Sequence, residues 1–231
     1  MAAVLVFQHN WFIPPGLLGE ALRDRGVDVR VCSLGEGEAV PDHHSWDGVA
    51  VLGGVMGAYD EAEHPWLVEE KHYLADAVSR GIPTLGVCLG VQLLADALGG
   101  SAYRGDGWEY GLLDVRLTDA GTADPVVRHL DAPVPVFHGD TFDLPPGAVL
   151  LAETERYRHG FRLGSAVAVQ SHPEASPDIT DVWVMRRAGD IRAHGADPGA
   201  LRAMLHAAEP AHREMSARFF GAWIDEVLGT S

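Results

Sequence analysis

Residues 82–100 read IPTLGVCLGVQLLADALGG, and this stretch decides the fold. The apolar run 82–87 predicts a buried strand, and residues 89–98 have the apolar periodicity of a helix that the following Gly-Gly pair ends. One residue, Cys88, separates the strand from the helix. A tight strand-to-helix turn is therefore expected at Cys88.

The rest of the first half repeats this alternation of strand and helix. Helical periodicity occurs at 17–25 and 66–80, and Gly81 ends the second of these segments. Strands that alternate with helices of this length favour a parallel sheet covered on both faces. The predicted strands of this sheet are residues 4–7, 27–32, 48–52 and 82–87.

The second half of the chain changes character. Short strand-like segments, separated by Pro, Gly and Asp, predict a mixed or antiparallel extension of the same sheet. These segments are residues 112–117, 134–137, 148–152 and 166–170. The chain then becomes helical over about residues 176–228, and no repeat or linker interrupts it. We therefore expect one α/β domain over residues 1–231.

The charge of the chain excludes some classes of function. Its 231 residues include 33 acidic and 17 basic side chains, so the net charge is −16. Such a surface repels phosphate backbones and anionic membranes, which argues against nucleic-acid and membrane-surface binding. The longest apolar run, residues 48–58, is shorter than the roughly 20 residues of a membrane span. Two cysteines and no leader-like start predict a reducing, cytoplasmic location.

The sequence GVCLG at residues 86–90 has the form of a nucleophile elbow. The two glycines permit a tight turn with a strained nucleophile at its tip. The N-terminus of the following helix stabilises negative charge, which favours the thiolate form of Cys88. Taken alone, the motif fits equally well a buried core thiol between two helix-packing glycines.

A second segment, Ser171-His172-Pro173-Glu174, follows the predicted strand 166–170. A histidine at the carboxyl end of a strand lies at the edge where open α/β sheets build their sites. There His172 could take the proton of a thiol, and Glu174 could hold the imidazole in one tautomer. Alone, His172 would be interpreted as a turn histidine. Together with Cys88, it favours a catalytic interpretation.

Such a site also needs donors for a developing oxyanion. Gly53 and Gly54 follow the strand 48–52, and their backbone N–H groups could point to the same edge. The N–H of Leu89, at the start of the helix, is the natural second donor. The glycine pair alone is also explained as an ordinary strand-to-helix turn.

These motifs together resemble the class I (triad-type) glutamine amidotransferases. Within that family, Glu109-Tyr110-Gly111 and the segment 137–145 resemble the GMP-synthase-like branch. The resemblance implies an open, mostly parallel, flavodoxin-like sheet and hydrolysis of glutamine through a γ-glutamyl thioester. The roles it implies are Cys88 as nucleophile, His172 and Glu174 as its partners, Gly54 and Leu89 as the oxyanion hole, and Gly53, Gln92, His138 and Asp140 as substrate-binding residues.

The resemblance implies no cofactor and no metal, and it leaves the acceptor of ammonia open. Neither the Ser-Gly-Gly-rich nucleotide loop of GMP synthase nor a Walker motif occurs in the sequence. We therefore expect ammonia to pass to a separate synthetase. The alternative is a free-standing hydrolase of γ-glutamyl peptides or amines, and the third hypothesis is a non-catalytic protein with a regulatory or binding role.

Other residues receive simpler interpretations. Cys32 is expected to be a core residue, and His43, His44, His64 and His72 are expected to be surface histidines without metal-ligand spacing. Residues 11–13 could border the site, and local packing explains them equally well. We expect Arg186, Arg187 and Arg213 to be solvated helix charges. The stripe expected to pack the C-terminal helices on the sheet is Trp183, Phe219, Phe220, Trp223 and Ile224.

Overall fold

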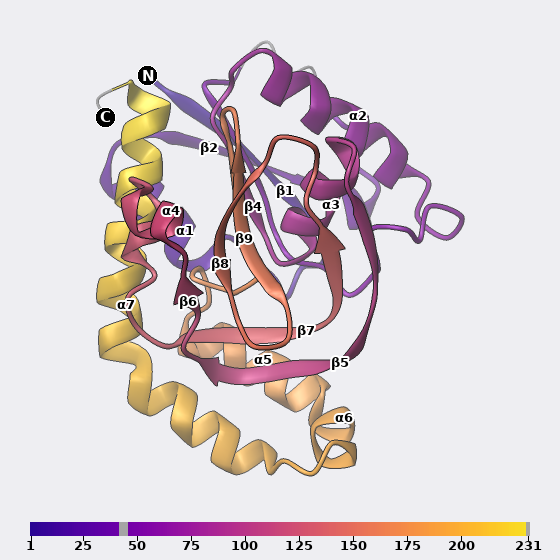
Figure 1. Cartoon of the computed structure of the whole chain (residues 1–231), viewed down its shortest axis with the longest axis vertical. Coiled ribbons are helices and arrows are strands. Elements are labelled where there is room, and N and C mark those ends of the chain that lie inside the picture. The colour runs from indigo at the N-terminus through magenta and orange to yellow at the C-terminus, as the bar shows by residue number, and fades with distance from the viewer. Residues whose placement is uncertain (42–45, 230–231) are drawn as a thin grey trace.

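An eight-stranded sheet forms the centre of the molecule in the computed structural model, which describes residues 1–41 and 46–229 (Figure 1). The strand order is β2-β1-β3-β4-β10-β9-β8-β6. The first five strands in this order run parallel to one another. These are β2 (Asp28–Ser33), β1 (Ala3–Gln8), β3 (Gly48–Val51), β4 (Thr84–Val87) and β10 (Ala166–Val169).

Antiparallel strands continue this sheet beyond β10, so the predicted mixed extension is confirmed. They are β9 (Arg158–Leu163), β8 (Val149–Glu153) and β6 (Arg116–Leu117). The sequence did not indicate β9, because its Arg, His and Gly residues interrupt any apolar alternation.

Two strands that were expected in this extension form a sheet of their own. β5 (Ser101–Leu113) pairs antiparallel with β7 (Val134–Asp143). The prediction of one strand at 112–117 is therefore wrong, since β5 ends and β6 begins within that segment. Glycines and charged residues leave β5 without a strong apolar pattern, and its stabilisation comes from pairing with β7 rather than from its own burial.

Helices cover both faces of the central sheet, and alternate strand residues supply the two cores. On one face, Val4 and Val6 pack with α1 and the C-terminal half of α7. On the other, Leu5 and Phe7 pack with α2 and α3. The helices of these layers are α1 (Gly16–Asp24), α2 (Trp66–Ser79), α3 (Leu89–Ala97), α4 (Asp119–Ala123) and α7 (Pro198–Leu228).

The long helix α7 changes direction along its length (Figure 1). Pro210 lies inside it, and proline lacks the N–H that would continue the helical bonding. Before Pro210, Leu201 and Leu205 join a small core with α5 (Pro177–Arg186) and α6 (Ala188–Ala193). After it, the helix packs on the central sheet. One helix thus covers two cores.

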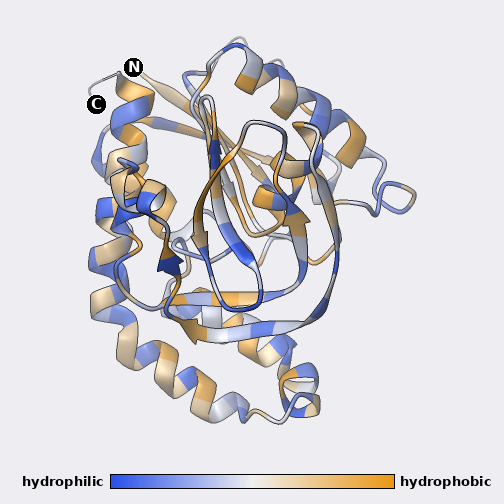
Figure 2. Cartoon of the chain, viewed as in Figure 1, coloured by the Kyte–Doolittle hydropathy of each residue, from blue (hydrophilic) through white to orange (hydrophobic). Residues whose placement is uncertain are grey.

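The distribution of hydropathy agrees with these layers. In Figure 2, helices α2 and α7 carry both apolar and polar residues along their length. The predicted packing of Phe219, Phe220, Trp223 and Ile224 on the sheet is confirmed, whereas Trp183 lies in a separate cluster with Ile13. No helix among the described residues is long and apolar enough to cross a membrane. His43 and His44 lie outside the described residues.

Candidate active site

Cys88 occupies the turn between β4 and α3 in a strained conformation. Its φ of 54° makes it the one non-glycine residue with positive φ in the described part of the chain. The turn can pack this tightly only because residues 86 and 90 are glycines. A Cβ at either position would lie within 2.6 Å of a backbone oxygen. The Cys88 N–H donates to the carbonyl of Val169, 2.9 Å away, which holds the turn beside the end of β10.

His172 and Glu174 follow β10 and form a buried pair. His172 Nδ1 lies 2.7 Å from Glu174 Oε1, and Glu174 is fully buried. The His172 N–H donates to the carbonyl of Pro135 on β7, which fixes the loop. The ring of Trp183 packs on the imidazole with a centroid distance of 4.6 Å. Packing and hydrogen bonding therefore leave His172 little freedom to turn.

Charge in this pair favours the protonated imidazole. Burial by itself lowers the pKa of His172, but the negative charges of Glu174 and of the Cys88 thiolate outweigh it and raise the pKa to about 10. At neutral pH His172 is therefore protonated.

The turn Gly53-Gly54 lies against both groups. A Cβ at Gly53 would lie 3.1 Å from His172 Cε1 and 3.5 Å from Cys88 Cβ. A Cβ at Gly54 would lie 2.5 Å from Leu89 Cδ2, so the turn also packs closely on the start of α3. Side chains at these two positions would fill the space next to the thiol.

A buried ion pair between His9 and Glu70 supports the Gly53-Gly54 turn. His9 follows β1, its Nδ1 donates to the carbonyl of Gly53 at 3.1 Å, and its Nε2 lies 3.0 Å from Glu70 on α2. Both residues are almost completely buried. Burial opposes the charged form of His9, but Glu70 outweighs it and the pKa of His9 is raised.

Cys88 lies where two lobes of one cavity meet. We define the polar lobe, of about 410 Å³, by Gln92, Arg104, His138 and Asp140. We define the aromatic lobe, of about 480 Å³, by Phe12, Ile13, His172, Trp183 and Arg186. Both lobes include Gly54, Val55, Cys88, Phe137, Arg187 and Asp190.

The wall of the polar lobe is held by its own hydrogen bonds. Gln92 is buried, and its Nε2 donates to Gln170 Oε1 at 3.2 Å and to the carbonyl of Asp140 at 3.4 Å. The Asp140 carboxylate accepts from the Tyr59 hydroxyl at 3.0 Å and pairs with Arg104 at 3.3 Å. The lobe therefore offers both a carboxylate and a guanidinium to a ligand.

Comparison with known proteins identifies the family. The family model described as glutamine amidotransferase class-I matches residues 16–188. The chain belongs to the class I glutamine amidotransferases. A glutamine amidotransferase-like protein of Salmonella typhimurium is 31% identical over 153 residues, which cover 64% of this chain and 64% of that protein.

Two further relatives align with this chain over nearly their whole length. One subunit of the glutamine-hydrolysing GMP synthase of Natronomonas pharaonis is 30% identical over 201 residues, covering 81% of this chain and 98% of that protein. The crystal structure of a Thermotoga maritima glutamine amidotransferase matches with a TM-score of 0.87 at 28% identity and covers 98% of both chains. Several glutamine-hydrolysing GMP synthases match over 33% of their own length or less.

The fold brings together most of the residues that the sequence singled out. Cys88 and His172 line one cavity, and Glu174 pairs with His172 from behind. Gln92, His138 and Asp140 line the polar lobe. The expectation that residues 11–13 border the site is met by Phe12 and Ile13. Cys32 is buried, as expected.

Other features of the site did not follow from the sequence. The guanidinium of Arg186 stacks on the ring of Phe12 at 4.1 Å, and Arg187 lines both lobes, so these residues are not simply solvated charges. Trp183 contacts His172 instead of the sheet. His9 could have been found by the argument used for His172, because it also follows a strand at the carboxyl edge.

Proposed function

We propose that this amidotransferase hydrolyses the side-chain amide of glutamine through a γ-glutamyl thioester on Cys88. The observation that carries this proposal is the position of Cys88. A strained cysteine at the start of a helix meets an imidazole that a buried carboxylate orients, and it does so at the junction of two cavity lobes.

In the proposed reaction, the Cys88 thiolate attacks the amide carbon of glutamine. The backbone N–H groups of Gly54 and Leu89 donate to the oxygen that becomes negative. His172 then gives its proton to the departing nitrogen, the C–N bond breaks, and ammonia leaves. Water attacks the thioester after His172 has taken one of its protons, and glutamate and the Cys88 thiolate are released.

The polar lobe suits the amino-acid end of glutamine. Its Asp140 carboxylate can pair with the α-ammonium group, and the guanidinium groups of Arg104 and Arg187 can pair with the α-carboxylate. The amide nitrogen of Gln92 already donates to Gln170 and Asp140, so its amide oxygen is the atom that can accept a hydrogen bond from substrate. Gly53 keeps the space beside the thiol open.

The two cysteines allow a matched test. Cys88→Ala is expected to abolish glutamate release from glutamine, and Cys32→Ala to retain it. A diazoketone analogue of glutamine should label wild type and Cys32→Ala once per chain, at Cys88. Labelling at Cys32, or turnover by Cys88→Ala, would overturn the assignment, and circular dichroism shows whether each variant is folded.

The aromatic lobe favours a second candidate substrate, a γ-glutamyl peptide or amine. His172 lines this lobe, and it protonates the leaving group, so the leaving group lies on that side of Cys88. The lobe has a volume of about 480 Å³, whereas ammonia is about the size of a water molecule, roughly 30 Å³. Phe12 and Trp183 could contact an apolar leaving group, and Arg186 an anionic one.

Turnover of a substrate panel separates the two candidates. We would compare kcat/KM for glutamine, a γ-glutamyl dipeptide and a γ-glutamyl anilide, with Cys88→Ala as the blank. Preference for the peptide or anilide supports a free-standing hydrolase. Preference for glutamine supports delivery of ammonia to a separate synthetase. No turnover and no labelling of Cys88 would favour the hypothesis of a non-catalytic, regulatory protein.

A further inference from the structure

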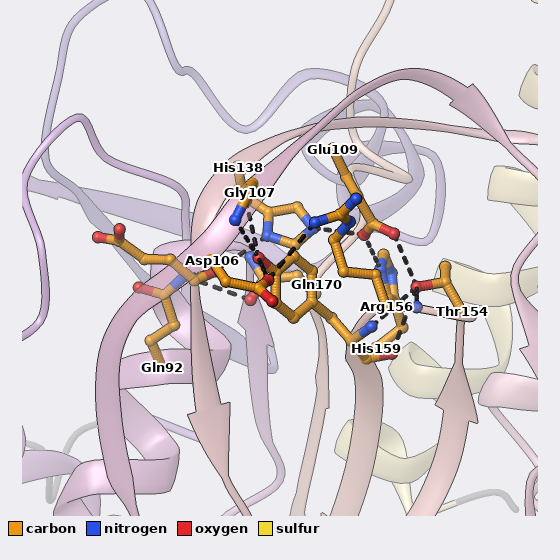
Figure 3. A network of polar contacts seen from close by, with 11 residues as sticks. Gln92, Asp106, Gly107, Glu109, His138, Thr154, Arg156, His159 and Gln170 are labelled. Atoms are coloured by element: carbon orange, nitrogen blue, oxygen red, sulfur yellow. Dashed lines mark hydrogen bonds and ion pairs between the residues drawn. The ribbon is translucent and has the colours of Figure 1, made fainter.

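Three side chains from three strands converge next to the polar lobe. Glu109 comes from β5, His138 from β7 and His159 from β9. One potential ligand atom of each lies within 4.8 Å of the other two. Figure 3 shows both imidazoles directed at the carboxylate of Glu109. We propose that these residues bind a divalent transition metal ion of the zinc class.

The orientation of the His138 ring supports this assignment. Its Nδ1 lies 2.9 Å from the carbonyl oxygen of Asp140, which can only accept a hydrogen bond, so Nδ1 is the donor in this contact. Its other nitrogen, Nε2, faces Glu109 Oε2 across 3.1 Å. A backbone carbonyl on the remote nitrogen is the usual support of a metal-binding histidine.

Glu109 is oriented in the same way. Its Oε1 accepts from the hydroxyl of Thr154 at 2.7 Å, which leaves Oε2 directed at the two histidines. The Thr154 hydroxyl is itself held by the N–H of Tyr157 at 3.1 Å. The carboxylate that would ligate the ion therefore has a fixed rotamer and a hydrogen-bonded second oxygen, as in established metal sites.

His159 completes the set. It is fully buried, and its Nε2 lies 2.7 Å from Glu109 Oε2. Its Nδ1 is a buried polar atom without a hydrogen-bond partner among the described residues. No hydrogen bond at Nδ1 therefore prevents Nε2 from binding a metal ion. Two imidazoles with one carboxylate oxygen suit Zn²⁺ or a similar ion better than Mg²⁺ or Ca²⁺, which prefer oxygen ligands throughout.

The site has a route from solvent. Glu109 and Thr154 line a surface cavity of about 900 Å³ whose acidic residues include Asp106, Asp114 and Glu155. Arg116 and Arg156 also line it, and they pair with Glu153 and Asp106. The acidic groups can attract a cation, and the cavity leaves room for water as a fourth ligand. A bound ion would join the β5–β7 sheet to β9 and stiffen the wall that carries His138 and Asp140.

Metal binding is best measured in a Cys88→Ala background, because Cys88, His172 and Glu174 could themselves bind zinc. Chelator-treated protein would be titrated with Zn²⁺ by calorimetry, and with Co²⁺ by visible absorption. We expect one ion per chain. Glu109→Gln and His159→Asn should each weaken binding at least tenfold, and the exposed His72→Asn should leave it unchanged.

Two measurements keep the test decisive if a ligand variant unfolds. Thr154→Val keeps all three ligands but removes the hydrogen bond to Glu109 and the acceptor of the Tyr157 N–H, and it should weaken binding about 10- to 100-fold. X-ray absorption of the zinc-loaded Cys88→Ala protein should show two imidazoles at about 2.0–2.1 Å and no sulfur. Absence of stoichiometric binding, equal affinity in all variants, or a spectrum without imidazole would overturn the site.

Discussion

Cys88 and Cys32 show how position decides the chemistry of a residue type. Cys88 lies at the start of α3 beside a protonated His172. Cys32 lies in the core at the end of β2, where burial, assisted by the charge of Glu38, raises the pKa of its thiol to about 11. Only Cys88 has a neighbouring positive charge that is held in place by packing. The two thiols should therefore differ in reactivity within one molecule.

The first prediction concerns Glu174→Gln. Because Glu174 helps to raise the pKa of His172, the substitution should lower that pKa and weaken the charge that stabilises the thiolate. Alkylation of Cys88 by iodoacetamide between pH 6 and 9 should therefore be slower in Glu174→Gln than in wild type. Turnover should fall about 10²- to 10⁴-fold without being lost.

Cys32 serves as the internal control for this experiment. With a pKa of about 11 and no exposure to solvent, it should not be alkylated in the same pH range. Mass spectrometry of the two cysteine peptides separates the rates. Equal alkylation rates of Cys88 in wild type and Glu174→Gln would contradict the role proposed for the carboxylate.

At the scale of elements, burial decided what the sequence could predict. The strands β1, β3, β4 and β10 are apolar and buried on both faces, so their sequences alone indicate a parallel sheet. The segments β5 and β9 carry glycines, arginines and histidines, and only their pairing with β7 and β8 makes them strands. Tertiary contacts of this kind leave no local pattern in the sequence.

Some residues of the candidate site could be predicted from the sequence, and others could not. Motifs located Cys88, His172 and Gly53 because each follows an apolar strand at the carboxyl edge of the sheet. The approach of Trp183 and Arg186 to that edge depends on how α5 packs, which no motif encodes. The cluster of Glu109, His138 and His159 depends on the register between two sheets, which the sequence does not reveal.

The second prediction concerns the link between β1, α2 and the Gly53-Gly54 turn. His9→Leu leaves Glu70 buried without its partner, and it should lower the free energy of unfolding by about 3–5 kcal/mol. The double substitution His9→Leu with Glu70→Leu should recover most of this loss, because it removes both buried charges. Guanidinium unfolding of the three proteins measures these differences.

The contribution of this ion pair should also depend on pH. The pKa of His9 is raised in the folded state, so its contribution is fully present below about pH 6.5 and is lost as pH rises through the raised pKa. The stability difference between wild type and the double variant should therefore be more favourable to wild type at pH 6 than at pH 9. A difference that grows with pH would show that His9 is neutral in the folded protein.

At the scale of the whole molecule, the two main cores share one sheet. Alternate residues of β1 belong to different cores. If the strand unfolds, the apolar side chains of both cores therefore become exposed to solvent. The small core of α5, α6 and the start of α7 is tied to the same sheet by the continuous helix α7. We therefore expect the chain to unfold as one cooperative unit.

The third prediction follows from this arrangement. Far-ultraviolet circular dichroism and tryptophan fluorescence should give coincident unfolding curves, because the six tryptophans include Trp223 in the main core and Trp183 in the α5 segment. Calorimetry should give one transition whose enthalpy equals the van't Hoff value, on the order of 160 kcal/mol for 231 residues near 60 °C. An earlier fluorescence change that disappears in Trp183→Phe would mean that the segment beyond β10 opens separately. Since Arg186 and Trp183 line the aromatic lobe, such opening would expose His172 before the sheet unfolds, and loss of turnover would then precede loss of strand structure.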